Sequence, residues 1–117
     1  MAMWISCNSR LSEEKTNELL GKLKNQYSEI VQYFFVSEAR PCNYSLRDRE
    51  KENGLDALCS FIVERNDDKS PYPLRIMPKL LYEVFGPDTI LVHGLDYELI
   101  RPEDAENIAI HGFSPDR

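Results

Sequence analysis

Two histidines and three cysteines are the side chains of this sequence best suited to chemistry at neutral pH. His93 ends an apolar run and Asp96 follows three residues later, so a His–Asp pair could activate a thiol such as Cys42 or Cys59. Cys59 stands inside an apolar run, which is typical of an inert buried thiol, whereas Cys42 begins a polar segment. A small enzyme using His93 and Asp96 is therefore one hypothesis. The simpler interpretation is a packed His93 that bonds to backbone.

No motif in the sequence names a reaction. The chain has no glycine-rich phosphate loop, no GxSxG and no HExxH. It also lacks the CxxC or HxxxH pair that would supply half of a zinc site. The acids between Asp96 and Glu106 do not follow the spacing of a calcium loop. We therefore predict no catalytic residues, no metal site and no cofactor.

The acidic residues gather at one end of the chain. Over residues 1–79, twelve Lys or Arg balance twelve Asp or Glu, and from residue 80 onward eight acids face two Arg, so the last third carries the net charge of -6. A field of one sign attracts a basic partner and repels nucleic-acid phosphate. Tyr97 adds an aromatic residue of the type that interfaces favour. The predicted partner-binding surface consists of Asp96, Tyr97, Glu98, Glu103, Asp104 and Glu106. A merely solvated acidic face is the alternative.

Length and composition set the remaining bounds. A chain of 117 residues with 42% hydrophobic residues predicts a single globular domain over residues 1–117. No apolar run approaches the roughly 20 residues of a membrane span, and no secretory signal is visible. Three unclustered cysteines indicate reduced thiols and hence a cytoplasmic location. The oligomeric state stays open.

A one-faced helix over residues 13–28 is the clearest element in the sequence. Ser12 is a favoured N-cap residue, and Glu13 and Glu14 suit the positive end of the helix dipole. The apolar residues that recur at helical spacing are Leu19, Leu20, Leu23 and Tyr27.

The other elements follow from apolar pattern and turn residues. Strands are expected at residues 4–7, 30–36 and 89–92, where branched and aromatic residues concentrate. Residues 40–54 are expected to form a long polar loop. Residues 55–63 fit a buried strand or a buried helix, and the bulky end Phe61-Ile62-Val63 favours the strand.

A second helix and a C-terminal extension complete the pattern. Pro78 suits the first turn of a helix that ends at Gly86. Alternation over residues 95–99 predicts a half-exposed strand after a bulge or tight turn at Gly94, and Pro102 opens a short helix.

The resulting fold class is α+β. The order βαββαβ is that of the ferredoxin-like split β-α-β unit, an antiparallel sheet with two helices on one face. A short C-terminal helical extension follows, and the other face of the sheet is left for water, a ligand or a partner. The residues predicted to be in the core are Leu20, Leu23, Phe34, Ile62, Leu81 and Val84.

The first sixty residues resemble an RNA-recognition motif. Met3-Trp4-Ile5 stands where that family has its first platform strand, and residues 19–35 are similar to its first helix and second strand. Residues 54–61 fall where its second platform motif belongs, but Leu55 and Leu58 occupy the positions of the stacking aromatics. Trp4 is more simply interpreted as a core anchor.

A second resemblance is confined to six residues. The stretch 53–58, Asn-Gly-Leu-Asp-Ala-Leu, is similar to one in the barstar-type ribonuclease inhibitors, which are small acidic neutralising proteins. In that family the stretch is helical, which disagrees with the strand interpretation. Neither resemblance is adopted as the family of this chain.

The preferred function is that of a non-enzymatic binding protein that acts by protein–protein contact, and a neutralising or immunity-type inhibitor of a basic partner is its concrete form. A degenerate nucleic-acid-binding domain like an RNA-recognition motif is the first alternative, and the small enzyme is the second. Nucleic acid and membrane are not expected partners, because the chain is acidic and lacks a span.

Overall fold

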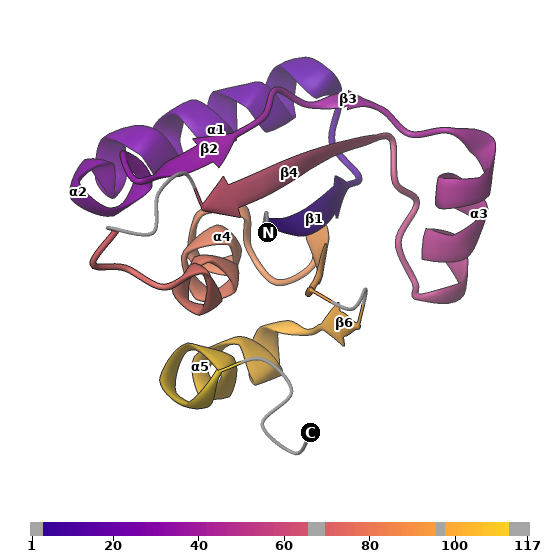
Figure 1. Ribbon diagram of the computed structural model, residues 1–117. Coiled ribbons are helices and arrows are strands. Elements are labelled where there is room, and N and C mark those ends of the chain that lie inside the picture. Colours follow the sequence, from indigo (N-terminus) through magenta and orange to yellow (C-terminus); the bar gives the residue numbers. More distant parts are fainter. Residues whose placement is uncertain (1–3, 66–69, 96–97, 113–117) are drawn as a thin grey trace.

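The computed structural model describes residues 4–65, 70–95 and 98–112. Within these residues six strands form one antiparallel sheet in the order β2-β4-β1-β5-β6, with β3 also paired to β4 (Figure 1). The strands are β1 (Trp4–Ser9), β2 (Phe34–Val36), β3 (Arg40–Pro41), β4 (Cys59–Arg65), β5 (Ile90–His93) and β6 (Leu99–Ile100). The predicted α+β class is confirmed.

Five α-helices in the described part of the chain accompany this sheet. They are α1 (Glu13–Gln26), α2 (Ser28–Val31), α3 (Tyr44–Glu52), α4 (Met77–Phe85) and α5 (Pro102–His111), and a 3-10 turn at Leu74–Ile76 leads into α4. None of these helices combines the length and the apolar character that a membrane span requires.

The core lies between one face of the sheet and helices α1 and α4. Alternate residues of the central strands point to this side, because successive residues of a strand face opposite ways. The sheet residues Ile5, Cys7, Phe61, Val63 and Val92 pack there with Leu20, Leu23, Leu81 and Phe85 from the helices. Burial of Leu20, Leu23, Phe34 and Leu81 confirms four of the six predicted core residues.

The other two predicted core residues differ from expectation. Val84 is half-buried and packs against the core from its edge. Ile62 lies on the opposite face of the sheet, because its neighbours Phe61 and Val63 take the core side. Trp4 is not a core anchor either, since its side chain is 42% exposed on that same opposite face.

The capping residues predicted for the two main helices are found at the ends of α1 and α4. The Ser12 hydroxyl accepts a hydrogen bond from the amide of Lys15 at 3.2 Å, as an N-cap does. Pro78 stands in the first turn of α4, and Gly86 ends that helix with a φ of 89°. A positive φ of this kind is open to glycine at little cost.

The strand predicted over residues 30–36 is too long. Its first part belongs to α2, where the Val31 amide donates to the Tyr27 carbonyl at 2.8 Å, and only Phe34–Val36 is strand. Burial of Val31 against the core outweighs the strand preference of a branched side chain.

The polar loop predicted over residues 40–54 is wrong. Arg40–Pro41 pairs with β4, and the segment then forms the helix α3. Asn43 caps this helix by accepting from the Leu46 amide at 2.8 Å, and Gly54 follows its end with a φ of 91°. The helix is polar nearly all round, so apolar periodicity gave no signal of it.

The remaining differences are at strand ends. Residues 55–63 do contain a strand rather than a helix, but it spans Cys59–Arg65 and the preceding residues only lead into it. Of the strand predicted over residues 95–99, Leu99 belongs to β6, Leu95 is exposed, and residues 96–97 lie outside the described residues. The Gly94 amide donates a hydrogen bond to the Glu98 carbonyl at 2.8 Å, which brings these two described residues together.

Candidate functional site

The face of the sheet that points away from α1 and α4 carries a buried histidine at one end and two exposed aromatic side chains at the other. Cross-strand register places its residues in rows, since paired residues share a face. One end of the face is formed by Asn8, Leu91 and His93, and the other by Trp4, Glu64 and Phe35. Helix α3 covers the first end and leaves the second open.

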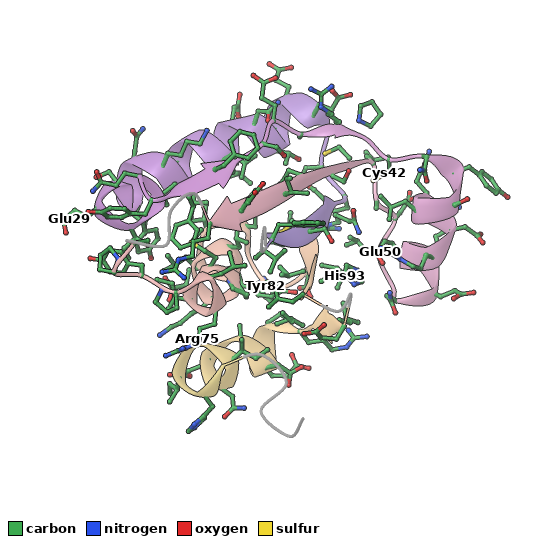
Figure 2. All side chains as sticks on the ribbon, viewed as in Figure 1. Glu29, Cys42, Glu50, Arg75, Tyr82 and His93 are labelled. Atoms are coloured by element: carbon green, nitrogen blue, oxygen red, sulfur yellow. The ribbon has the colours of Figure 1, made fainter. Side chains whose placement is uncertain are left out.

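Glu50 is a fully buried carboxylate that joins α3 to the sheet. Its side chain meets His93 of β5 (Figure 2). It also meets Asn8 of β1. Nε2 of His93 lies 3.1 and 3.0 Å from the two oxygens of Glu50, and Nδ2 of Asn8 lies 2.9 Å from one of them. Because an ionised carboxylate only accepts, both nitrogens donate to it.

Two further groups complete the surroundings of this carboxylate. Nδ2 of Asn53 donates to Oε1 of Glu50 at 3.1 Å, and Nε of Arg49 lies 3.6 Å from the same oxygen. Burial by itself would raise the pKa of Glu50. The hydrogen bonds from His93, Asn8 and Asn53 and the charge of His93 outweigh burial and hold that pKa to about 2.

The low pKa of Glu50 predicts an acid-dependent stability. A carboxyl group whose pKa is lower in the folded than in the unfolded chain stabilises the fold above the unfolded value and ceases to do so as pH falls through the folded value. We therefore expect the free energy of unfolding, measured by urea denaturation, to fall between about pH 4.5 and pH 2. The decrease should be smaller in Glu50→Gln, and parallel profiles of the two proteins would contradict this assignment.

A small apolar cluster secures the same end of the face. Leu55, Ala57 and Leu91 are buried together, with Cys42 and Leu99 packed against them. The segment after α3 thus returns over β5, which places Glu50 between the helix and the sheet. The buried carboxylate and this cluster together hold α3 in position.

The other end of the face is open. Glu64 is paired across the sheet with Trp4 on one side and with Phe35 on the other, so the carboxylate stands between two aromatic side chains. Trp4 is 42% and Phe35 48% exposed, and Glu64 is half-buried. Apart from the backbone pairing of its strand, Glu64 is not engaged: its carboxylate forms no hydrogen bond or ion pair with another residue in the described part of the chain.

A groove of about 290 Å³ continues from this open end towards α3. Its floor is the sheet, and its walls are α3, β3 and the segment before β3. The lining residues include Ser6, Asn8 and Ile62 from the floor and Arg40, Leu46 and Arg49 from the walls.

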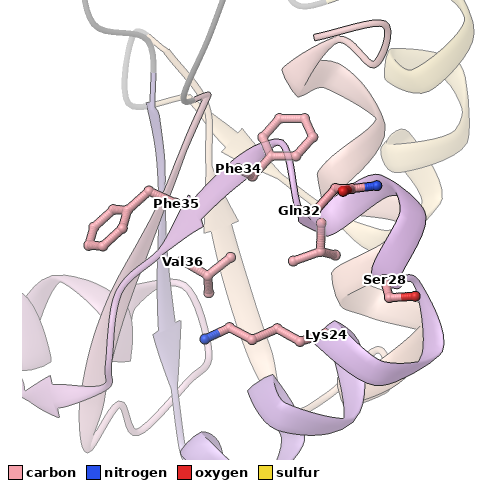
Figure 3. Close-up of a pocket in the computed structure, with 7 residues that line it drawn as sticks. Lys24, Ser28, Gln32, Phe34, Phe35 and Val36 are labelled. Carbon is pink, nitrogen blue, oxygen red and sulfur yellow. The ribbon is translucent and has the colours of Figure 1, made fainter.

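A larger hollow of about 480 Å³ lies on the other side of β2, at the edge of the sheet (Figure 3). It is lined by Lys24 of α1, by Ser28 and Gln32 around α2 and by β2 itself. Figure 3 shows Phe35 projecting away from the side on which Lys24 and Ser28 lie. This hollow holds one cation and no carboxylate among its lining residues in the described part, so it offers no acid–base pair.

The three thiols do not form a nucleophilic site. Burial raises the pKa of Cys7, Cys42 and Cys59, so each is kept as a thiol at neutral pH. The predicted structural role of Cys59 is confirmed, since its sulfur is buried, donates to the Leu11 carbonyl at 3.3 Å and lies 3.2 Å from the Thr16 hydroxyl.

His93 is buried, as the simpler sequence interpretation required, but the carboxylate that contacts it was not anticipated. Asp96, its proposed catalytic partner, lies outside the described residues. The described part of the chain contains no group of three or more His, Cys, Asp or Glu arranged to hold a metal ion.

Four of the six residues of the predicted acidic surface lie in the described part of the chain. Glu103, Asp104 and Glu106 lie exposed on α5, and Glu98 is half-buried before β6. Asp104 also caps its own helix, because its Oδ2 accepts from the Arg101 amide at 3.4 Å. The remaining members, Asp96 and Tyr97, lie outside the described residues.

Sequence reasoning missed Glu50 and Phe35. Asn43 as an N-cap, the helix-forming residues after it and the Asn53-Gly54 end were the available signal for α3. Alternation across Phe34-Phe35-Val36 was the signal that one aromatic side chain faces away from the core.

Comparison with known proteins adds family information. A family model for the CDI System Immunity Component matches residues 1–96. The match includes β1 to β5 and α1 to α4, and it ends before β6 and α5.

Two relatives are similar over most of the chain. The Immunity protein CdiI-2 of Burkholderia pseudomallei (strain 1026b) is 29% identical over 93 residues, which cover 79% of this chain and 92% of that protein. A chain in the solved CdiA-CT/CdiI toxin and immunity complex from Burkholderia pseudomallei has a TM-score of 0.69 and 27% identity, covering 77% of this chain and 88% of that chain.

Proposed function

Because the chain belongs to the family of CDI system immunity components, we propose that it neutralises the toxin of its own CDI system by binding it. The observation that carries this proposal is the family match over residues 1–96, and the likeness to a chain in a toxin and immunity complex supports it. The sequence favoured a protein-binding function, and under this proposal the bound protein is a toxin.

We propose that neutralisation is stoichiometric rather than enzymatic. The raised thiol pKa values and the engagement of His93 by Glu50 support this, since the three cysteines are kept as thiols and Nε2 of the buried His93 is occupied by Glu50. The chain would then block the toxin by occupying its surface.

The test is expression of the CdiA-CT toxin domain of the same CDI system with and without this chain. We expect the chain to restore cell growth, and purified toxin to lose its activity in proportion to added chain up to one equivalent. Toxin recovered from the complex in denaturant should have an unchanged intact mass and regain activity on refolding. Full growth inhibition in the presence of folded chain would refute neutralisation, and inactivation by much less than one equivalent would refute stoichiometric binding.

The toxin is proposed to be basic where it meets this chain. Exposed carboxylates on α5 support this proposal, together with the net charge of -6. The contact surface would include Glu98, Glu103, Asp104 and Glu106, together with Asp96 and Tyr97, which lie outside the described residues. All six lie at or beyond the end of the family match, so this surface would serve recognition of the particular toxin of this chain.

The core is inferred to be a ferredoxin-like split β-α-β unit. The strand order β2-β4-β1-β5 and the packing of α1 and α4 on one face support this inference, with α3 inserted before β4 and with β6 and α5 appended. One domain over residues 1–117 and a cytoplasmic location are also proposed, the latter supported by three cysteines that are not joined by disulfides.

A further inference from the structure

The row Trp4–Glu64–Phe35 combines two aromatic rings with a carboxylate, and both kinds of group attract a cation. Neighbouring strands lie about 4.8 Å apart, so the two aromatic residues are separated by about 10 Å at their Cα atoms, with Glu64 between them. A cation attracted to an aromatic face lies within about 6 Å of the ring centre. One guanidinium or ammonium group can therefore contact both rings and the carboxylate together.

We propose that this open face of the sheet binds a basic segment of the toxin, with a Lys or Arg side chain seated between Trp4 and Phe35 against Glu64. The proposal rests on the proposed function for the identity of the partner. The chemistry of the occupant comes from charge complementarity, because Glu64 is a carboxylate without a partner among the described residues.

The groove beside this row supports a segment rather than an isolated side chain. Ile62 and Ser6 form the next row of the sheet and also line the groove, so the open face and the groove are continuous. Asn8 lines the groove as well, and its Oδ1 is a buried acceptor without a hydrogen-bond partner in the described part of the chain. A buried acceptor of this kind is costly until a donor reaches it, and the backbone amides of a bound segment supply donors. The basic side chain of the segment is placed at Glu64 and not in the groove, because Arg40 and Arg49 line the groove.

Nucleic acid is the other occupant that exposed aromatic residues on a sheet would suit. A carboxylate between the two rings repels the phosphate backbone, and the chain as a whole carries a net charge of -6. The basic protein segment is therefore favoured. All three residues of the row also lie within the part of the chain that the family model matches.

The experiment measures binding of the CdiA-CT toxin domain to three proteins: the native chain, Glu64→Gln, and the double variant Trp4→Leu/Phe35→Leu. The dissociation constant is expected to rise about tenfold or more in both variants, mainly through faster dissociation. Glu14→Gln and Tyr44→Leu are matched controls, because they remove an exposed carboxylate and an exposed aromatic ring from α1 and α3. The controls should stay within about twofold of the native chain.

Trp4 is the sole tryptophan of the sequence, so its fluorescence reports directly on this row. Toxin binding should shift its emission in the native chain. Unchanged affinity in both variants, with the native chain still neutralising the toxin, would overturn the proposal and leave the proposed function standing. Tight binding of a single-stranded RNA oligonucleotide that quenches Trp4 would also overturn it, in favour of a nucleic-acid face.

Failure of the native chain to bind the toxin would refute the proposed function, but it would leave the cation site to be tested separately. In that case a blocked Gly-Arg-Gly peptide and its Gly-Gln-Gly counterpart are titrated while Trp4 emission is followed. An emission shift with the arginine peptide alone, absent in Glu64→Gln, supports the cation site. Equal responses to the two peptides, or no response, overturn it.

Discussion

Replacing Glu50 with alanine is expected to lower the free energy of unfolding by about 3–5 kcal/mol, the usual cost of breaking a buried ionic contact from one side. Glu50 is fully buried and accepts from His93, Asn8 and Asn53. Without the carboxylate, all three donors lose this acceptor, and His93 and Asn8 remain buried. The measurement is denaturant unfolding at neutral pH, followed by circular dichroism.

The matched control for this prediction is Glu52→Ala. Glu52 lies two residues further along the same helix and is exposed, so its loss should change the free energy of unfolding by no more than about 0.5 kcal/mol. Similar losses in the two variants would show that the buried carboxylate is not held as the structure indicates. A variant that changes Glu50 and His93 together to methionine and leucine should recover part of the loss, because it removes both partners of the contact at once.

The structural role of this network explains why a polar helix is ordered at all. Helix α3 has few apolar residues with which to pack, and of its nine residues only Glu50 is buried. The hydrogen bonds from the sheet and the cluster around Leu55 and Leu91 take the place of an apolar stripe. Loss of the carboxylate should therefore release α3 and, with it, one wall of the groove.

Local signals predicted those elements whose stability comes from an apolar face. The helix with Leu20 and Leu23 and the helix that begins near Pro78 have such faces, and both are where the sequence placed them. Helix α3 has none, so the sequence resembled a loop although Asn43 and Gly54 marked its ends.

The candidate site was beyond sequence reasoning for a different reason. Glu50 meets Asn8 and His93, which are 42 and 43 residues away along the chain. Trp4, Phe35 and Glu64 likewise come together through strand register. Pairings of this length depend on the order of the strands, and local spacing carries no information about them. The type of function was nevertheless predictable, because it followed from small size, acidic charge and the lack of catalytic motifs.

Reversing the charge of Glu103 and Glu106 to lysine is expected to slow association with the toxin by about 10- to 100-fold at low salt. Both side chains are exposed on α5, three residues apart on one side of the helix. Asp104 is left in place because it caps the helix. The fold should be retained, because Ala105 is the buried residue of α5 and both substitutions leave it in place.

Net charge alone would also alter the association rate, so the control must carry the same change of charge. Glu14→Lys/Glu29→Lys provides it, because both residues are exposed on α1 and α2. If α5 is the contact surface, the α5 variant loses most of the salt dependence of association and the control keeps it. Equal effects in the two double variants would reduce the acidic third to a solvated face.

The kinetics also separate the two proposed surfaces. The charges on α5 should act mainly on the association rate, because electrostatic steering acts over a distance. The row around Glu64 should act mainly on the dissociation rate, because a side chain seated there must be withdrawn before the complex separates.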